Sequence, residues 1–470
     1  MFDVFIIGGG VSGGFIALEL SKYKLNIALA ERALEPANGS SRANSGIVHA
    51  GYDPIPGTLK AKLNIRGAEL MPEMAKRLNI DINLCGSYVI GFGKDDDERV
   101  YELYKRGLVN GVADISVVSG NELRKKEPNI SNEVTSALWA KTTGIISPYK
   151  LAITSVELAA QNGVEFLRAH EVIGMEDKGE YIHIVTNKGS YDAKYVVNAA
   201  GVNAAVIAGM LGDNSFEIIA RKGEYLILDK NESGIVNSVI FQVPSNMGKG
   251  ILVAPTVDGN VLLGPTSHNV DDKDDKTTTK EGIAEIVQHA KRSVPSVKER
   301  ALITMFAGMR AVPSTGDFII GQSRANSRLF NAAGIESPGL TSSPAIGEYL
   351  VNIMRESGVE LNKKENYFMQ RPAEKKIYKK YRMVDAVYTM EELKAAGMKR
   401  YQRMLEQLRS DGMELQSHSA VMKKKDTKNW ILQGHISFLC KKMTTRIVSE
   451  KEGTVKKREE GQHGESGNDS

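Results

Sequence analysis

The fold of this chain is decided by the stretch Val4-Phe5-Ile6-Ile7-Gly8-Gly9-Gly10-Val11-Ser12-Gly13. Its four apolar residues have the character of a buried parallel strand, and they run directly into a G-x-G-x-x-G turn. Helical spacing follows from Phe15 to Lys22, and a second apolar run from Leu25 to Leu29 leads to Glu31, 18 residues after Gly13. A strand, a glycine turn, a helix, a strand and an acid in this order predict a nucleotide-binding unit of an α/β fold.

Each conspicuous residue of this unit has a physical role in binding a dinucleotide. Gly8 permits the tight turn, Gly10 lets the backbone approach a pyrophosphate, and Gly13 lets helix and strand pack closely. The helix N-terminus then faces the anion. Glu31 would accept hydrogen bonds from the adenosine ribose hydroxyls and repel a 2′-phosphate. A glycine turn in an α/β domain without a ligand is the alternative.

A second strand-glycine-helix pattern lies late in the chain. A strand is predicted from Leu329 to Ala333, followed by Gly334, and a helix from about Ser342 to Arg355. A cofactor whose other end needs its own cradle explains both patterns, which favours FAD over NAD. A helix N-terminus aimed at the flavin N1–C2 edge would stabilise the negative charge of the reduced ring. An ordinary capped helix is the alternative here.

Length and composition are those of an ordinary soluble globular protein. The 470 residues are 41% hydrophobic and 25% charged, which predicts two packed domains and an appendage. Two cysteines exclude a disulfide scaffold and a cysteine-ligated metal centre, and they fit a reducing cytoplasm. Because no basic leader precedes an apolar stretch and no run of about 18 apolar residues occurs, neither a secretory signal nor a membrane span is expected.

The remaining elements predict two interleaved domains. Strand-like runs such as Tyr88–Phe92 and Ile251–Ala254, with helices around 96–110 and 279–293, indicate a second domain on a mixed or antiparallel sheet. The fold class is therefore α/β with an α+β second domain. The expected ranges are 1–78, 145–215 and 320–365 for a Rossmann-like FAD-binding domain, 79–144 and 216–319 for a substrate domain, and 366–470 for a basic, partly disordered C-terminal extension.

Several motifs together carry a resemblance to a known family. Beside the Gly8–Gly13 turn with Glu31, they are Arg42–Tyr52, Gly57–Asn64, Lys222–Tyr225, Gly264–Thr266 and Gly334–Pro344. Over about residues 1–370 the chain resembles the D-amino-acid-oxidase-type flavoproteins, and most of all the glycerol-3-phosphate dehydrogenases and oxidases and the L-2-hydroxyglutarate oxidases. The resemblance implies non-covalent FAD. The residues expected to contact it are Gly8, Gly10, Val11, Ser12, Gly13, Glu31, Arg32, Arg42, Asn44, Ser45, Val172, Ala200, Gly201, Gly334, Ile335, Gly339, Leu340 and Thr341.

Oxidising a secondary alcohol needs a base, and His49 is the candidate. Histidine titrates near neutral pH, and the resemblance places this glycine-flanked loop at the flavin face. The substrate's anionic end needs cations: Arg310, just after a strand-like stretch, matches a substrate-binding arginine of the family, and Lys249 could supply a second charge. Ser45 and Ser337 complete the predicted substrate contacts. A structural histidine and solvated surface cations are the alternatives. No metal site is expected.

The C-terminal extension is basic. Residues 371–470 hold 22 Lys and Arg against 14 Asp and Glu, a net +8 within a chain of +4, so the rest is about −4. An amphipathic helix is expected from Met390 to Leu408. Many long relatives of the resembled family carry a four-cysteine iron–sulfur module here, and Cys440 alone cannot hold a cluster. The segment suits contact with an anionic membrane surface or a partner, and a remnant without function is the alternative.

These observations favour one reaction. The leading interpretation is FAD-dependent oxidation of sn-glycerol 3-phosphate to dihydroxyacetone phosphate by hydride transfer to flavin N5. Oxidation of L-2-hydroxyglutarate or another 2-hydroxy acid is the first alternative, and a flavin-binding protein without turnover is the second. The electron acceptor is left open among oxygen, a quinone and a partner flavoprotein. The expected location is the cytoplasm, with peripheral contact at the inner membrane face as the variant, and no nucleic-acid partner is expected.

Overall fold

The computed structural model describes residues 1–244, 250–371, 414–415 and 422–423. Its internal contacts divide the chain into two compact units, Met1–Ala373 and Glu374–Ser470. In the second unit, β21 (Glu414–Leu415) pairs antiparallel with β22 (Met422–Lys423). The helix predicted from Met390 to Leu408, the candidate Lys249 and Cys440 lie outside the described residues.

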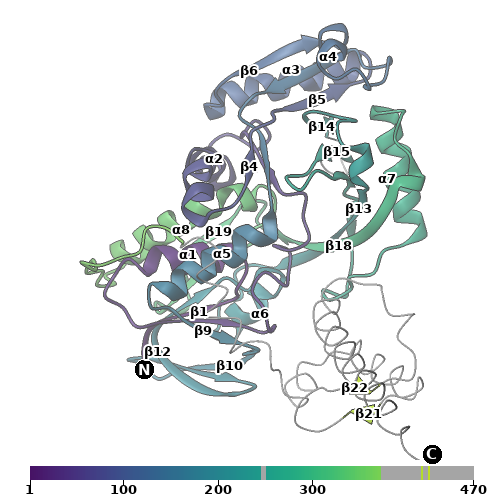
Figure 1. The fold of residues 1–470 in the computed structure, drawn as a ribbon. Helices are drawn as coiled ribbons and strands as arrows, with labels where there is room; N and C mark the ends of the chain where they lie inside the picture. Colours follow the sequence, from purple (N-terminus) through teal and green to yellow (C-terminus); the bar gives the residue numbers. More distant parts are fainter. Residues whose placement is uncertain (245–249, 372–413, 416–421, 424–470) are drawn as a thin grey trace, which may run out of the picture. The chain divides into compact units, whose positions relative to one another are not determined.

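The first sheet of unit Met1–Ala373 carries the glycine turn (Figure 1). Its strands lie in the order β10-β11-β12-β1-β2-β9, with β20 beside β12 and β19 beside β20. The parallel strands are β1 (Phe2–Ile7), β2 (Ile27–Glu31), β9 (Glu165–Arg168), β12 (Gly189–Asn198) and β20 (Leu329–Ala333). The antiparallel additions are β10 (Val172–Asp177), β11 (Ile182–Thr186) and β19 (Ile319–Gln322).

Both faces of this sheet are buried, as β1 shows directly. Val4 and Ile6 enter one hydrophobic core and Phe5 and Ile7 another, because side chains alternate along a strand. The first core is completed by α1 (Val11–Leu20), α2 (Leu59–Leu78), α5 (Pro148–Gln161) and α8 (Gly339–Glu356). The second includes α6 (Ala204–Gly209), which follows the short 3-10 helix η1 (Gly201–Asn203).

The second sheet is mixed, with mostly antiparallel pairs. Its order is β17-β13-β16-β15-β14-β5-β7-β6 with β18 on β13, and only β14 and β5 are parallel among these described strands. The strands are β5 (Ser87–Gly91), β6 (Ile115–Ser119), β7 (Ser136–Ala140), β13 (Ile218–Leu228), β14 (Val239–Gln242), β15 (Leu252–Pro255), β16 (Val261–Gly264), β17 (His268–Asn269) and β18 (Leu302–Pro313). Its helices are α3 (Lys94–Asn110), α4 (Gly120–Lys126), α7 (Lys280–Ser293), η2 (Lys230–Glu232) and η3 (Glu299–Ala301).

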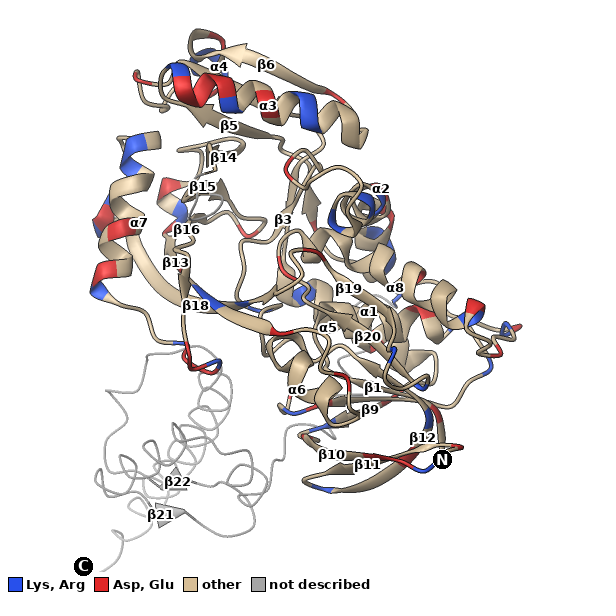
Figure 2. Ribbon diagram, turned by 180° about the vertical axis from the view of Figure 1, so that it is seen from behind, with Lys and Arg blue, Asp and Glu red and all other residues tan. Residues whose placement is uncertain are grey.

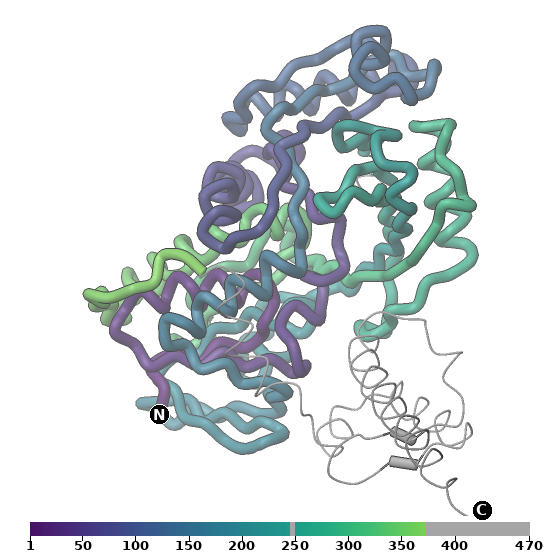
Figure 3. Tube along the Cα trace, in the orientation of Figure 1, coloured from purple at the N-terminus to yellow at the C-terminus, as the bar shows by residue number. Residues whose placement is uncertain are grey.

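A small third sheet lies between the two. It pairs β3 (Ile47–Val48) and β4 (Ile82–Asn83) with β8 (Gly144–Ile146), so the loop after β3 starts from a fixed strand. The segment after α8 returns to the N-terminal end of the chain: the Lys24 N–H donates to the Asn362 carbonyl and the Lys364 N–H to the Lys22 carbonyl. Figure 3 shows this light-green segment beside the purple N-terminal one.

The predicted fold class is confirmed, and the helices expected around 96–110 and 279–293 correspond to α3 and α7. One local prediction is wrong: Arg310 does not follow a strand but lies inside β18, whose whole length pairs with β13. The charged Arg310 interrupts the apolar pattern, so the sequence indicates a strand that stops before it, and the continuation to Pro313 shows only in the pairing with β13. The division into two domains stays a prediction.

The charged side chains of the second sheet's helices gather on their outer sides. Figure 2 shows Lys, Arg, Asp and Glu side by side along α3 and α7, whose opposite faces are buried at Val100 and Leu103 and at Ile286 and Ala290. In the part of the chain that the structure describes, no helix is both long enough and apolar enough to cross a membrane.

Candidate active site

The glycine turn after β1 has the geometry that a pyrophosphate needs. Gly8 adopts φ +110°, and a Cβ on Gly13 would lie 1.9 Å from the Gly8 carbonyl oxygen, so only glycine lets α1 start here. α1 begins at Val11 with Gly10 as its N-cap and no side-chain cap. The Val11 N–H donates to Ser41 Oγ at 2.9 Å. The positive end of the helix is therefore open to an anion.

Glu31 lies beside this turn, and a backbone N–H orients each of its carboxylate oxygens. Oε2 accepts from the Gly9 N–H at 2.8 Å and Oε1 from the Ala33 N–H at 2.9 Å. Burial raises the pKa of Glu31, and these two hydrogen bonds act in the opposite direction. Since a carboxylate oxygen accepts more than one hydrogen bond, both oxygens can still accept ribose hydroxyls.

The other residues predicted near the adenosine surround the same point. A Cβ on Gly8 would lie 2.4 Å from the Ala199 carbonyl oxygen, so Ala200 and Gly201 follow immediately beside the turn. The His170 N–H donates to the Glu31 carbonyl, which brings Val172 near that acid. Arg32 directs its guanidinium instead to Asp274, at 2.7 Å on the surface.

The loop 42–46 is held by its own side chains and by β18. Asn44 Nδ2 donates to the Ser40 and Ser41 carbonyls, and its Oδ1 accepts from the Gly46 N–H. A Cβ on Gly308 would lie 1.9 Å from the Ala43 carbonyl oxygen, so the loop rests directly on β18. The Asn44 side chain is thus used within the loop, and a contact with a cofactor would have to come from elsewhere on this segment.

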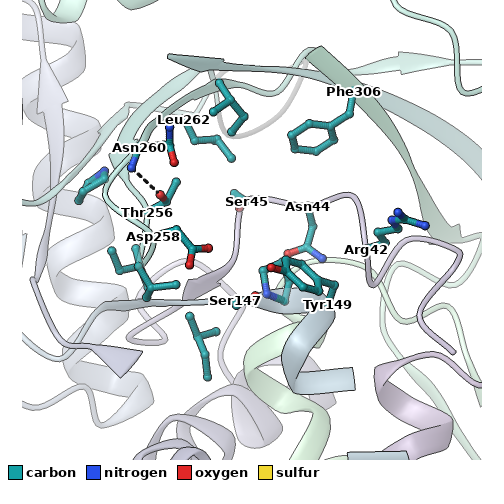
Figure 4. A pocket seen from close by; sticks show the side chains of 16 residues that line it. Arg42, Asn44, Ser45, Ser147, Tyr149, Thr256, Asp258, Asn260, Leu262 and Phe306 are labelled. Atoms are coloured by element: carbon teal, nitrogen blue, oxygen red, sulfur yellow. Dashed lines mark hydrogen bonds between the residues drawn. The ribbon is translucent and has the colours of Figure 1, made fainter. Parts of the chain in front are cut away.

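A pocket of about 190 Å³ opens on one side of this loop (Figure 4). Arg42, Asn44 and Ser45 line it together with Tyr149 and Phe306. His49, Arg310 and Ser337 are not among its lining residues. Ser45 therefore borders this pocket, whereas the candidate base His49 follows β3, outside the loop 42–46.

His49 is fixed on several sides. Its N–H donates to Thr341 Oγ1 at 2.9 Å, and its carbonyl accepts from Asn64 Nδ2 at 2.7 Å. The ring stacks on Phe241 of β14, with centroids 5.9 Å apart. Its Nε2 lies 3.3 Å from Ser337 Oγ, and the donor in this pair depends on the tautomer. The structure thus brings together two of the predicted residues, His49 and Ser337.

The start of α8 lies beside His49, since Thr341 in its first turn accepts the His49 N–H. Gly334 adopts φ +63° at the end of β20, and the helix begins at Gly339 with no side-chain cap. Glu336 pairs with Lys60 Nζ at 2.7 Å, which fixes the segment between β20 and α8. The Thr341 hydroxyl donates to the Ile47 carbonyl while it accepts from the His49 N–H, so it ties the segment 47–49 to α8. Because no side chain caps the start of α8, its positive end can stabilise a negative charge on a bound group.

Arg310 is oriented by neighbours on the second sheet. Its two terminal nitrogens donate to Ser267 Oγ and to the Thr266 carbonyl, both at 3.2 Å. Burial raises the pKa of the Tyr225 phenol, and Arg310 beside it acts in the opposite direction. The Tyr225 ring stacks on Phe306, with centroids 4.8 Å apart. This guanidinium is therefore held in one plane, as bidentate recognition of an anion requires.

The residues present fit a dinucleotide cofactor with a flavin end. Two uncapped helix starts, at Gly10 and at Pro338, follow two parallel strands of one sheet, and the acid Glu31 closes the adenosine side. In the first turn, a Cβ on Gly8 or Gly13 would collide with backbone, one on Gly9 would press on Glu31, and one on Gly10 would press on Ser41. The model of the FAD dependent oxidoreductase (DAO) family matches residues 3–353, and the chain belongs to this family. The prediction of FAD is confirmed.

Similar proteins include two that are named for glycerol 3-phosphate or glycerophosphate and one that is named for L-2-hydroxyglutarate. The chain is 45% identical over 367 residues to a glycerol 3-phosphate dehydrogenase of Caloramator mitchellensis, covering 78% of this chain and 76% of that protein. The FAD-bound, dithionite-reduced L-alpha-glycerophosphate oxidase of Mycoplasma pneumoniae superposes with a TM-score of 0.76 at 32% identity, covering 79% and 98%. An L-2-hydroxyglutarate dehydrogenase of Escherichia coli K12 is 29% identical over 273 residues, covering 57% and 64%.

Sequence reasoning missed four side chains that shape this site: Ser41, Asn64, Tyr225 and Phe241. Asn64 and Tyr225 stand inside motifs that carried the resemblance, but nothing in those motifs indicates a contact. Ser41 precedes the loop 42–46, and only the helix start at Val11 explains it. Phe241 lies in the short strand β14 and has no local signal.

Proposed function

We propose that this chain oxidises sn-glycerol 3-phosphate to dihydroxyacetone phosphate, with His49 as the base. One observation carries the proposal: the His49 ring, the Ser337 hydroxyl and the start of α8 meet at one point of an FAD dependent oxidoreductase fold. The similarity to a glycerol 3-phosphate dehydrogenase and a glycerophosphate oxidase supports this substrate.

The residues divide the reaction between them. When bound, FAD supplies the hydride acceptor, held by the Gly8–Gly13 turn, Glu31 and the start of α8. His49 takes the proton of the substrate's C2 hydroxyl at Nε2, since histidine is the side chain whose ordinary pKa lies nearest neutral pH. Ser337 Oγ, 3.3 Å from that nitrogen, orients the ring and the substrate oxygen.

The anionic end of the substrate is assigned to Arg310. Its planar fork suits a phosphate, and the hydrogen bonds to Ser267 and Thr266 keep that fork from rotating. Lys249 and Ser45 are proposed as further contacts on sequence grounds. A carboxylate fits the same fork, so L-2-hydroxyglutarate is the second candidate, and the similarity to its dehydrogenases favours it over other 2-hydroxy acids.

An anaerobic substrate screen tests this assignment. Purified protein with its flavin oxidised is mixed with sn-glycerol 3-phosphate, L-2-hydroxyglutarate or sarcosine, and bleaching of the flavin absorbance is followed. The enantiomer sn-glycerol 1-phosphate is the matched control. Rapid bleaching by sn-glycerol 3-phosphate alone is expected. Bleaching by L-2-hydroxyglutarate instead would replace the substrate, and a flavin indifferent to all of them would leave a binding protein without turnover.

A further inference from the structure

One face of α2 contacts both segments that carry the candidate proton-transfer groups. Lys60, Asn64 and Gly67 are spaced i, i+4 and i+7, so they lie on the same side of the helix. Lys60 Nζ forms an ion pair with Glu336 Oε1, next to Ser337, at 2.7 Å. Asn64 Nδ2 donates a hydrogen bond to the His49 carbonyl at 2.7 Å. A Cβ on Gly67 would lie 2.1 Å from the Thr341 carbonyl oxygen, so α8 packs directly on this face.

Asn64 is not explained by stability. It is fully buried, and its Nδ2 donates to the His49 carbonyl. Its Oδ1 has no hydrogen-bond partner among the described residues. A buried amide oxygen without a partner is unfavourable, and a leucine would avoid that cost but would leave the His49 carbonyl without its donor. The amide is therefore explained by its one hydrogen bond, which reaches the backbone of His49.

The His49 peptide groups are held from two helices at once. Thr341 of α8 accepts from the His49 N–H at 2.9 Å, and Asn64 of α2 donates to the His49 carbonyl. Thr341 is fully buried and ties Ile47 as well. With the backbone fixed on both sides, the stacked Phe241 and the Ser337 hydroxyl act on a ring whose starting point is already set.

We propose that Asn64 is a positioning residue for His49, and that its amide sets the angle at which the imidazole meets the substrate hydroxyl. This inference rests on the proposed function, which makes His49 the base. It assigns a role to the motif Gly57–Asn64, which starts α2 at the cap Thr58 and places Asn64 on the helix face that contacts His49.

The first test separates rate from stability. Asn64→Leu should slow anaerobic reduction of the flavin by sn-glycerol 3-phosphate about tenfold to a hundredfold, because a small misplacement of a reacting group costs that much. The KM and the FAD content should change little. Tm should fall no further than in the control, because removal of the partnerless amide oxygen offsets part of the cost of the lost donor to the His49 carbonyl. Met71→Ala is the matched control: it is buried in the same helix, two turns farther on. It should lower Tm and leave the rate unchanged. A normal rate in Asn64→Leu, or a rate loss that merely follows Tm in both variants, overturns the inference.

A conservative variant gives a pH signature. In Asn64→Asp, the protonated carboxyl can donate to the His49 carbonyl but the carboxylate cannot. The rate relative to wild type should therefore be highest at low pH and fall as pH rises. A constant ratio across pH contradicts a positioning hydrogen bond.

A double-mutant cycle separates this inference from the function on which it rests. If Asn64 acts through His49, adding Asn64→Leu to His49→Ala should cause no further loss of rate. Equal additional loss in both backgrounds overturns the inference and leaves the base assignment intact. A normal rate in His49→Ala overturns the base assignment, and the role of Asn64 falls with it.

Discussion

Replacement of Gly13 by alanine probes the cofactor turn most sharply. The Cβ would lie 1.9 Å from the Gly8 carbonyl oxygen and 3.5 Å from Ala199 Cβ. Real Cβ contacts are almost never shorter than 3.0 Å, so α1 must move away from the turn by about 1 Å. The obstacle is backbone, which cannot rotate away as a long side chain would.

In Gly13→Ala, a displaced α1 should lower both the folding free energy and the affinity for FAD. Overpacking of this kind costs about 1–3 kcal/mol of folding free energy. A shift of the helix start also weakens hydrogen bonds to the pyrophosphate, which contribute about 1.5–3 kcal/mol each when the acceptor is charged. The loss of one such bond raises the Kd for FAD about tenfold to a hundredfold.

The assay is titration of apoprotein with FAD, with Tm measured in parallel. Gly39→Ala serves as the control, since a Cβ there meets nothing within 4 Å and its backbone φ is not in the left-handed region. Gly13→Ala should bind FAD at least about tenfold more weakly, whereas Gly39→Ala should bind normally. Unchanged affinity in Gly13→Ala would refute the assignment of this turn to the pyrophosphate.

Three further predictions concern Glu31, Asp275 and Arg310. Burial raises the pKa of Glu31 and ribose hydroxyls need its ionised form, so the affinity for FAD should fall as pH drops through that raised value; a flat profile from pH 8 down to the ordinary value of 4.5 would contradict this. Asp275→Asn leaves the buried Lys222 ammonium without its partner and should cost about 2 kcal/mol in urea unfolding. Because hydrogen bonds from Lys222 and then from Thr277 lower the pKa of Asp275 from 3.8 to about 2, the wild type should lose this stability as pH falls through that window, and the variant should show no such loss. Arg310→Lys should raise KM for the substrate about tenfold with kcat nearly unchanged, and an unchanged KM would remove Arg310 from the anion site.

The parts of the fold that depend on local signals are readable in the sequence. The turn at Gly8–Gly13 needs residues without a Cβ, and α2 has a threonine cap at Thr58 and a left-handed end at Asn79. β18 is different, because its strand character comes from pairing with β13 along its whole length. Local patterns cannot reveal such a pairing when glycine, arginine and exposed apolar residues interrupt the alternation.

The candidate site also combines residues that the sequence reveals with residues that only the structure reveals. His49 could be predicted from its glycine-flanked loop and the family resemblance. Its partners could not, since Thr341 is 292 residues away in sequence and Phe241 comes from the second sheet. Asn64 stood in a recognised motif, yet only the rotation of α2 shows what it touches. The role of Lys249 and the function of the basic C-terminal segment stay predictions of the sequence.

The central claim is that sn-glycerol 3-phosphate reduces the flavin of this protein with His49 taking the hydroxyl proton. Its most direct test is single-turnover flavin reduction in anaerobic stopped flow, comparing the wild type with His49→Ala at saturating substrate. We predict rapid bleaching in the wild type and a rate at least about a hundredfold lower in the variant, with equal FAD content in both. Equal rates in the two proteins would contradict the claim.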